Sequence, residues 1–196
     1  MALFFRLNLV STMKKILILD RDGVINQDSD AFVKSAAEWI PLPGSIEAIA
    51  RLYKAGWILA VATNQSGLAR GKFDQKDLDE QHAKMLNLIH QAGGDLHYIA
   101  WCPHGPDDNC DCRKPKAGLL DQISQALKLD LTGSLMVGDA LRDLQAGQAR
   151  GCQVVLVRTG KGMKTLASGE GLEGVKVVDN LADLADQLLK TQPAKN

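Results

Sequence analysis

The chain has 196 residues, of which 45% are hydrophobic, and its 23 Lys and Arg balance 23 Asp and Glu. A chain of this size can bury one sizeable core, so we expect one globular domain. The formal net charge of zero argues against binding to nucleic acid or to an anionic membrane surface, and no apolar run approaches the length of a membrane helix. We therefore expect a small-molecule partner.

The first residues, 1–13, are apolar but contain Arg6 in their middle. They have no basic start and no cleavage site, so no signal peptide is predicted and a cytoplasmic location is expected. We expect these residues to form a frayed extension, in which Met13 is a second candidate start. A domain over 14–190 and a tail over 191–196 follow.

Segments of strand and helix character alternate after this extension. Short continuous apolar runs predict buried strands, and apolar residues at helical spacing predict helices. In chain order, the predicted elements are a strand over 14–20, a helix over 44–55, a strand over 57–63, a helix over 74–92, a strand over 97–101, a helix over 116–128, a strand over 134–137, a helix over 141–150, strands over 153–157 and 175–178, and a helix over 181–189.

This alternation predicts an α/β fold, a three-layer Rossmann-like arrangement with a mainly parallel central sheet and helices on both faces. Ligands of such sheets bind at the carboxyl ends of the strands. Two long loops interrupt the alternation, over 21–42 and 103–115, and loops of this length in compact domains are usually functional. No segment suggests a large separate cap domain.

Four aspartates follow predicted strands. Asp20 and Asp22 end the first strand on a turn that Gly23 allows to bend, Asp139 ends the fourth strand, and Asp143 comes shortly after it. Because parallel strands bring their carboxyl ends to one edge, we expect these carboxylates to meet. Such a cluster needs a cation, and oxygen ligands suit Mg²⁺ with a substrate phosphate. A turn or helix-cap role is the alternative for each aspartate taken alone.

Further polar groups could bind a phosphate at the same edge. The second strand is followed by hydroxyl, amide and backbone N–H groups of Thr63, Asn64, Gln65 and Ser66. Arg113 and Lys114 precede a helix, and loop cations aimed at the carboxylates would bind phosphoryl oxygens. For the residues after the second strand, the alternative is an ordinary turn. For Arg113 and Lys114, the alternative is that both charges are solvated at the surface.

The segments DRDGVIN, Thr63, Lys114 and GDALRD, in this order, resemble the four motifs of the haloacid dehalogenase superfamily of phosphatases. The resemblance implies that Asp20 is the nucleophile that becomes an aspartyl phosphate and that Asp22 is the general acid and base. Thr63 and Lys114 would hold the transferring phosphoryl group. The implied Mg²⁺ ligands are Asp20, the backbone carbonyl of Asp22 and the carboxylate of Asp139, with Asp143 in a supporting role.

Three cysteines and one histidine crowd into the loop after the third strand. Cys102, His104, Cys110 and Cys112 supply the usual complement for a closed tetrahedral zinc site, although clustered buried thiols are the alternative. With all four positions filled by protein, zinc would be structural. It would order a polar loop and fix the two cations that follow Cys112.

The loop CPHGPDDNCDCRKPK resembles the zinc loop of two groups within the superfamily, the D-glycero-D-manno-heptose 1,7-bisphosphate phosphatases and the histidinol-phosphate phosphatases. The segments TNQSGLARG, GDALRDLQAG and VLVRTGKG are more similar to the first group. That resemblance implies a sugar bisphosphate substrate and a place in lipopolysaccharide core synthesis. It also implies sugar contacts at Asp28, Ser29, Asp30 and Ala31, and binding of the remote phosphate by Arg113.

Alternative functions remain at this point. A histidinol-phosphate phosphatase shares the whole mechanism. A receiver-like signalling domain shares the sheet and the acidic strand ends, but it would not explain the cysteine loop. A zinc module that binds nucleic acid conflicts with the neutral charge and with three aspartates in that loop, Asp107, Asp108 and Asp111. A monomer is expected.

Overall fold

The computed structural model describes residues 16–190. The predicted N-terminal extension (1–13) and tail (191–196) lie outside these residues, as do the first two positions of the first predicted strand. Within the described part, no helix combines the length and the apolar character needed to span a membrane.

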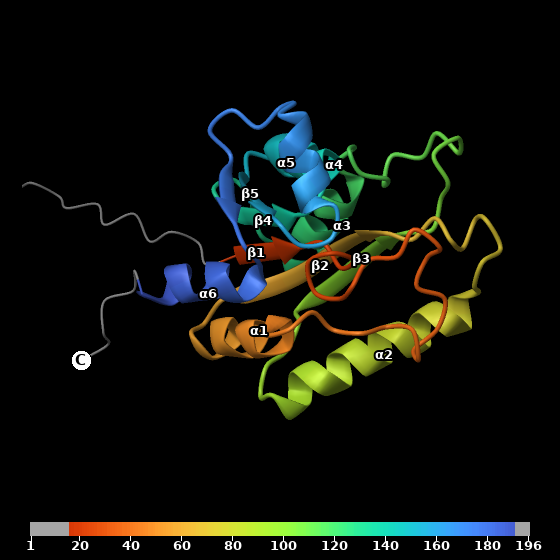
Figure 1. Ribbon diagram of the computed structural model, residues 1–196, viewed down its shortest axis with the longest axis horizontal. Helices are drawn as coiled ribbons and strands as arrows, with labels where there is room; N and C mark the ends of the chain where they lie inside the picture. The colour runs from red at the N-terminus through yellow and green to blue at the C-terminus, as the bar shows by residue number, and fades with distance from the viewer. Residues whose placement is uncertain (1–15, 191–196) are drawn as a thin grey trace, which may run out of the picture.

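Six parallel strands within residues 16–190 form the central sheet (Figure 1). They are β1 (Ile16–Leu19), β2 (Ile58–Asn64), β3 (Tyr98–Cys102), β4 (Leu135–Gly138), β5 (Gln153–Val157) and β6 (Lys176–Val178), in the spatial order β3-β2-β1-β4-β5-β6. Each pair of neighbouring strands is parallel. The predicted α/β fold with a mainly parallel sheet is therefore confirmed.

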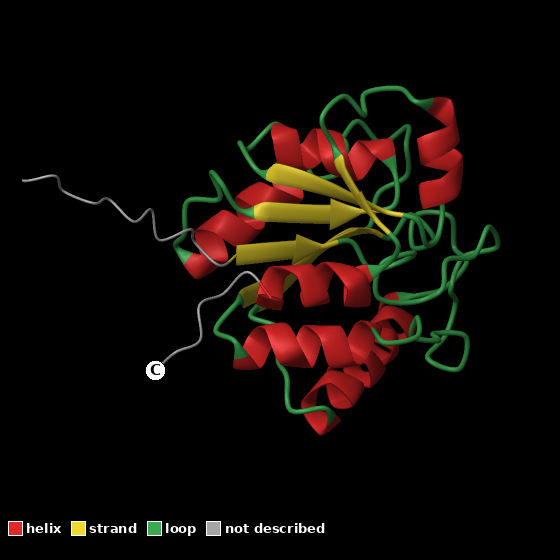
Figure 2. Ribbon diagram, turned by 60° about the vertical axis from the view of Figure 1, so that its left-hand side comes forward, coloured by secondary structure: helices red, strands yellow, loops and turns green. Residues whose placement is uncertain are grey.

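Helices cover both faces of the sheet (Figures 1 and 2). They are α1 (Ser45–Lys54), α2 (Gln75–Gln91), α3 (Gly118–Leu127), α4 (Leu141–Gln148), α5 (Gly162–Ser168) and α6 (Leu181–Lys190). Helices α1, α2 and α6 pack on one face through the cluster that contains Leu17 and Leu19, whereas α3 and α4 pack on the other through Ile16 and Ile18. This alternation explains why β1 is a continuous apolar run, because it is buried on both faces.

Local sequence signals account for most element boundaries. Asp74 caps α2 in a capping box with Asp77, as the sequence predicts for a helix that begins there. The helix predicted from residue 116 begins at Gly118 instead. Helix α5 was absent from the predicted elements, because its seven residues carry no apolar helical period and only Gly162 is buried.

The strand order places a switch point at β1. The chain runs from β1 outward to β2 and β3, and then returns to β4 on the other side of β1. In open parallel sheets, ligands bind outside the carboxyl ends of strands at such a point. The loops after β1, β2 and β4 meet there.

Candidate active site

Three buried carboxylates meet at the carboxyl ends of β1 and β4. Ligand oxygens of Asp20, Asp139 and Asp143 all lie within 4.8 Å of one another. Burial and the nearby Asp143 carboxylate raise the pKa of Asp20 to about 6. Burial and the nearby Asp20 carboxylate raise the pKa of Asp139 to about 7. The predicted meeting is confirmed for these three carboxylates, whereas Asp22, the fourth of the prediction, is not part of the cluster. The mutual repulsion of the three calls for a cation.

Lys114 supplies one positive charge to this cluster from the loop after β3. Its Nζ lies 2.9 Å from Asp20 Oδ1 and 2.7 Å from Asp143 Oδ1, and it donates a 2.7 Å hydrogen bond to the Ala62 carbonyl. The side chain is fully buried. Although burial opposes its charge, Asp143 and Asp20 raise the pKa of Lys114. Lys114 is therefore a fixed cation beside the expected nucleophile.

Two side chains hold Lys114 in place. The Asn64 carboxamide donates to the Lys114 carbonyl and accepts from the Lys114 N–H, both at 3.1 Å. Asp143 uses Oδ1 for the ion pair with Lys114, while its Oδ2 accepts a hydrogen bond from the Ala140 N–H. Asn64 and Asp143 thus orient the lysine.

Asp20 and Asp139 retain oxygens for a metal ion. Both the Arg21 N–H and Lys114 contact Oδ1 of Asp20, which leaves Oδ2 for other partners. Asp139 Oδ2 accepts from the Lys161 N–H at 2.7 Å, but its Oδ1 is buried without a hydrogen-bond partner among the described residues. An unpartnered buried carboxylate oxygen is costly unless it binds a cation. This donor set fits Mg²⁺.

Close packing at this point requires glycine at residue 23. Gly23 has φ +85°, and a Cβ there would lie 2.1 Å from Asp139 Oδ2. Only glycine combines this backbone conformation with this approach. The turn of DRDG thus brings the chain after β1 directly against the carboxylate after β4.

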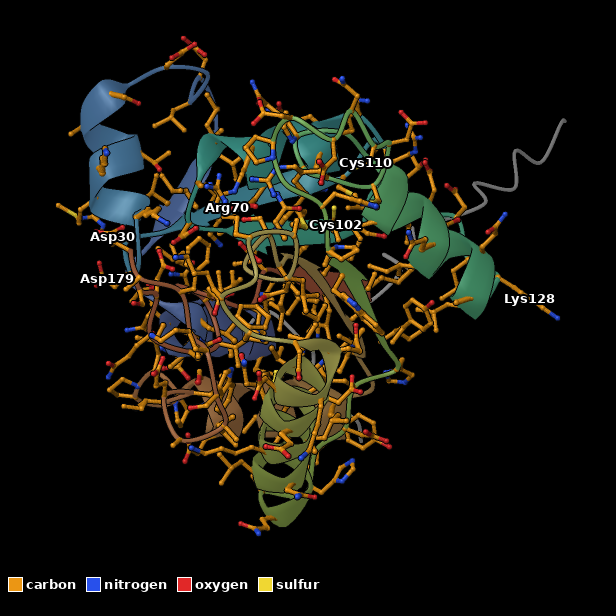
Figure 3. All side chains as sticks on the ribbon, turned by 90° about the vertical axis from the view of Figure 1, so that its right-hand side faces the viewer. Asp30, Arg70, Cys102, Cys110, Lys128 and Asp179 are labelled. Atoms are coloured by element: carbon orange, nitrogen blue, oxygen red, sulfur yellow. The ribbon has the colours of Figure 1, made fainter. Side chains whose placement is uncertain are left out.

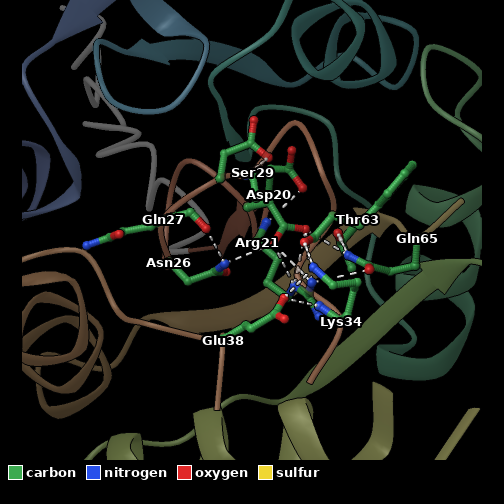
Figure 4. A network of polar contacts seen from close by, with 12 residues as sticks. Asp20, Arg21, Asn26, Gln27, Ser29, Lys34, Glu38, Thr63 and Gln65 are labelled. Atoms are coloured by element: carbon green, nitrogen blue, oxygen red, sulfur yellow. Dashed lines mark hydrogen bonds and ion pairs between the residues drawn. The ribbon is translucent and has the colours of Figure 1, made fainter. Parts of the chain in front are cut away.

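A cage of donors from Arg21, Asn26 and Gln65, which are labelled in Figure 4, surrounds the Asp22 carboxylate. Arg21 Nη2 lies 3.0 Å from Asp22 Oδ1, Asn26 Nδ2 donates to the same oxygen at 2.9 Å, and Gln65 Nε2 donates to Oδ2 at 2.8 Å. Although burial opposes ionisation, Arg21 and these hydrogen bonds lower the pKa of Asp22. The cage stabilises the ionised form, so protonation of Asp22 requires a nearby negative charge, which a bound phosphate carries.

A cavity of about 240 Å³ opens above these groups. Of the expected substrate-binding residues, the cavity is lined by Asp28, Ser29, Asp30, Asn64, Gln65, Ser66 and Arg113, together with Asp20, Asp22 and Thr63. Ala31 does not line it. Residues that line it without having been predicted are Arg21, Phe32, Val33, Arg142 and Lys161. Arg142 lies in the first turn of α4 and the other four residues lie in loops. Arg21, Arg142 and Lys161 lie inside the segments DRDGVIN, GDALRD and VLVRTGKG, but neither periodicity nor charge pattern shows that their side chains face the cavity.

The cysteine loop, in which Cys102 and Cys110 are labelled in Figure 3, forms a second candidate metal centre. Sγ of Cys102 lies 3.7 Å from Sγ of Cys110 and 3.6 Å from Nδ1 of His104, and Cys110 and Cys112 sulfurs are 3.6 Å apart. The contacts of Cys112 with Cys102 and His104 are shorter, 3.1 and 3.3 Å. Tetrahedral bonds of about 2.3 Å to sulfur and about 2.0 Å to nitrogen would separate ligand atoms by about 3.5–3.8 Å, so the four residues fit zinc.

This loop also orients Arg113 at the cavity. Arg113 Nη1 donates a 3.1 Å hydrogen bond to the carbonyl of His104, and the Arg113 side chain lines the cavity. His104 is one of the four clustered residues. The position of a cavity cation therefore depends on the fold of the cysteine loop.

Comparison with known proteins agrees with this geometry. A HAD-hydrolase-like family model matches residues 111–184. The D-glycero-β-D-manno-heptose-1,7-bisphosphate 7-phosphatase of Pseudomonas aeruginosa is 55% identical over 178 residues, which cover 90% of this chain and 99% of the relative. The protein of the same name from Bordetella bronchiseptica is 56% identical over 176 residues, which cover 90% of this chain and 98% of the relative.

Solved structures agree with the sequence comparison. The D,D-heptose 1,7-bisphosphate phosphatase from B. bronchiseptica, complexed with magnesium and phosphate, matches with a TM-score of 0.88 and 55% identity, and the match covers 90% of this chain and 99% of that one. The corresponding phosphatase from Burkholderia thailandensis matches with a TM-score of 0.72 and 42% identity over 91% of this chain and 100% of that one. The expected resemblance is thus confirmed, and the chain belongs to the heptose-1,7-bisphosphate 7-phosphatase family of HAD-like hydrolases.

Proposed function

We propose that this protein removes the 7-phosphate of D-glycero-β-D-manno-heptose 1,7-bisphosphate, in the synthesis of ADP-heptose for the lipopolysaccharide core. The observation that carries the proposal is the buried cluster of Asp20, Asp139 and Asp143, in which Asp20 pairs with Lys114 and also lines a small cavity. Relatives that are 50–56% identical over nine-tenths of the chain carry the name of this activity.

Asp20 is the proposed nucleophile. One carboxylate oxygen attacks phosphorus, the bond from phosphorus to O7 of the heptose breaks, and Asp22 gives a proton to the departing oxygen. The product of this step is an aspartyl phosphate. Asp22, now ionised and held by Arg21, then takes a proton from water, which attacks phosphorus and releases inorganic phosphate and free Asp20.

Thr63 and Lys114 hold the phosphoryl group during both steps. Thr63 Oγ1 accepts a 2.9 Å hydrogen bond from Gln65 Nε2, so its own proton can be donated to a phosphoryl oxygen. The Lys114 ammonium, buried and fixed by Asp143, offsets charge on the same oxygens. Phosphoryl transfer depends mainly on such positioning and charge neutralisation.

Magnesium would be held by the carboxylates of Asp20 and Asp139 and by the backbone carbonyl of Asp22. When bound, it neutralises charge on the nucleophile and on the phosphoryl oxygens and so allows the two to approach. The unpartnered Oδ1 of Asp139 supports this assignment.

The sugar and the remote phosphate would occupy the rest of the cavity. Arg113 would bind the 1-phosphate, while Asp28, Ser29 and Asp30 would contact the heptose. Ala31 would support this segment from outside the cavity, because its N–H donates to Ser29 Oγ. Ser66 would offer a hydroxyl. Asn64 and Gln65 are already committed to Lys114, Thr63 and the Asp22 cage, so we assign them to supporting those groups.

Zinc in the cysteine loop would be structural, because protein ligands would fill all four positions. We further propose that residues 14–190 form one phosphatase domain that acts as a monomer in the cytoplasm. The measurement of mass in solution by light scattering tests the monomer.

The decisive experiment measures phosphate release with Mg²⁺ from heptose 1,7-bisphosphate and from histidinol phosphate. We expect a kcat/KM at least about 100-fold higher for the bisphosphate, because a second phosphate adds a charge-assisted contact of a few kcal/mol. Preference for histidinol phosphate would reject the proposed substrate.

A further inference from the structure

The segment TGKG, residues 159–162, joins β5 to α5 and has no part in the chemistry above, yet it contacts both sides of the cavity. Thr159 Oγ1 donates a 2.6 Å hydrogen bond to the Gly23 carbonyl. The Lys161 N–H donates to Asp139 Oδ2 at 2.7 Å, and Thr165 Oγ1 in α5 donates to the Asp139 carbonyl at 2.8 Å. These bonds tie the segment to the carboxylate that would hold magnesium.

Close backbone packing reinforces this anchor. Gly160 has φ +58°, and a Cβ there would lie 2.2 Å from Asp139 Oδ2 and 2.5 Å from Gly23 Cα. No other residue can occupy this position without displacing the backbone. The backbone of Lys161 is therefore fixed relative to the reaction centre.

The side chain of Lys161 crosses to the opposite loop. Its Nζ lies 2.8 Å from Asp28 Oδ2, and the two side chains are 39% and 18% exposed. Although burial opposes its charge, the hydrogen bond with Asp28 raises the pKa of Lys161. One residue thus connects the Asp139 carboxylate, through its backbone, to the first residue of the 28–31 segment, through its side chain.

The ion pair also separates two cavities. Asp28, Asp30 and Lys161 line the reaction cavity, and the same three residues line a second cavity of about 440 Å³, whose remaining walls include Leu42 and Lys164. Residues shared by two cavities form the wall between them. Loss of the ion pair would join the two spaces and release the 28–31 segment.

We propose that Lys161 is a positioning residue that determines specificity for the sugar, by holding Asp28 as a wall at a fixed distance from the reaction centre. This inference rests on the proposed function. Lys161 does not need to contact a phosphate, since its ammonium is already paired with Asp28. Arg142 lines the same cavity, and its Nε lies 3.9 Å from Asp143 Oδ1 and makes no hydrogen bond among the described residues.

The test compares Lys161→Met with Lys161→Arg and with Lys164→Met, a matched removal of one charge from α5. Steady-state kinetics are measured with heptose 1,7-bisphosphate and with p-nitrophenyl phosphate, which has no sugar. We expect Lys161→Met to raise KM for the bisphosphate about 10-fold with kcat changed less than about 3-fold, since a partly exposed ion pair gives a modest effect on binding. Lys161→Arg should restore most of the affinity.

For p-nitrophenyl phosphate, the kinetic constants of Lys161→Met should change less than about 2-fold, which also shows that the variant is folded. Lys164→Met should resemble the unmutated protein on both substrates. An equal loss on both substrates in Lys161→Met would overturn the inference, because it would place Lys161 at the reacting phosphoryl group.

A double-mutant cycle with Asp28→Asn separates positioning from direct contact. If Lys161 acts through Asp28, the double variant should have the KM of the more impaired single variant. Effects that multiply would show independent roles and overturn the inference. If the unmutated protein hydrolyses p-nitrophenyl phosphate but not heptose 1,7-bisphosphate, the proposed function itself fails, and this inference fails with it.

Discussion

At the scale of single residues, Asp20 combines a chemical role with an electrostatic cost. The residue is 4% exposed, and its carboxylate lies within ligand distance of two other carboxylates. We expect Asp20→Asn to lower kcat by about 10⁴-fold or more, because an amide is a poor nucleophile and lacks the charge that binds a metal. Phosphate release under saturating substrate and Mg²⁺ is the measurement.

The same substitution should not destabilise the metal-free protein. Asparagine removes a buried charge that repels Asp143, and Lys114 keeps its ion pair with Asp143. The melting temperature without Mg²⁺ should therefore stay constant or rise. Near-normal turnover in a correctly folded Asp20→Asn variant would eliminate the aspartyl-phosphate mechanism.

Arg113 has a proposed role in substrate binding that can be tested separately from the chemical step. If it binds the remote phosphate in both the ground state and the transition state, Arg113→Ala should raise KM for the bisphosphate by about 10- to 150-fold, the equivalent of 1.5–3 kcal/mol for a hydrogen bond between charged groups. Hydrolysis of a small monophosphate should barely change. Arg70→Ala is a suitable control, because Arg70 is exposed and is absent from the lining of the cavity.

A comparable loss on both substrates would move Arg113 to the reacting phosphoryl group. That outcome is physically distinct, because Lys114 already occupies the position beside Asp20. Kinetics on the two substrates therefore determine which of two adjacent cations serves which phosphate.

At the scale of elements, the cysteine loop links metal binding to the cavity. We expect one zinc per chain, and we expect Cys110→Ala to lower zinc content, melting temperature and affinity for the bisphosphate together, because Arg113 is hydrogen-bonded to the carbonyl of His104. Elemental analysis of protein purified without chelators and thermal melting are the measurements.

Cys152→Ala provides the matched control. Cys152 is buried and free, and it lies outside the loop, so its loss should cost packing energy without altering zinc content. If protein with the unmutated loop contains no zinc and its three loop thiols react freely, the zinc assignment is wrong.

The elements also show what the sequence could reveal. The strands were predictable because burial on both faces imposes continuous apolar runs, as in β1, and α2 was predictable from its cap at Asp74. Helix α5 was not, because it is short and mostly exposed. Its position is set instead by the bond from Thr165 to the Asp139 carbonyl and by the loop before the helix, in which Thr159 donates to the Gly23 carbonyl.

The candidate site likewise contains residues that the sequence predicts and contacts that it does not. Asp20, Thr63 and Asp139 could be placed together from sequence, because parallel strands end at one edge and each residue lies within one position of the end of a strand. The cage around Asp22 and the ion pair of Lys161 could not, since they depend on how loops fold over that edge. Periodicity describes elements, whereas these contacts join residues in irregular segments.

At the scale of the whole molecule, the sheet concentrates negative charge that the fold alone does not neutralise. Asp20 and Asp139 have pKa values raised to about 6 and about 7, above the 3.8 of an unfolded aspartate, with burial as the largest cause. The folded protein therefore binds more protons than the unfolded chain between about pH 4 and pH 7. Without Mg²⁺, these groups stabilise the fold at low pH, and this contribution is lost progressively as pH rises from about 4 to about 7.

Bound Mg²⁺ should reverse this dependence, because it favours the ionised carboxylates of the folded state and displaces their protons. We therefore expect the rise in melting temperature on addition of Mg²⁺ to be larger at pH 7.5 than at pH 5.5 and to level off above about pH 7.5, where both groups are already ionised. Differential scanning fluorimetry with and without Mg²⁺ across this pH range measures the shift in melting temperature.

Asp139→Asn should remove most of the difference between the magnesium-induced shifts at the two pH values, since it deletes both a ligand and the group with the higher pKa. A magnesium-induced shift of equal size at both pH values would show that the metal binds elsewhere, and the buried cluster would then have to be neutralised by protons and Lys114 alone.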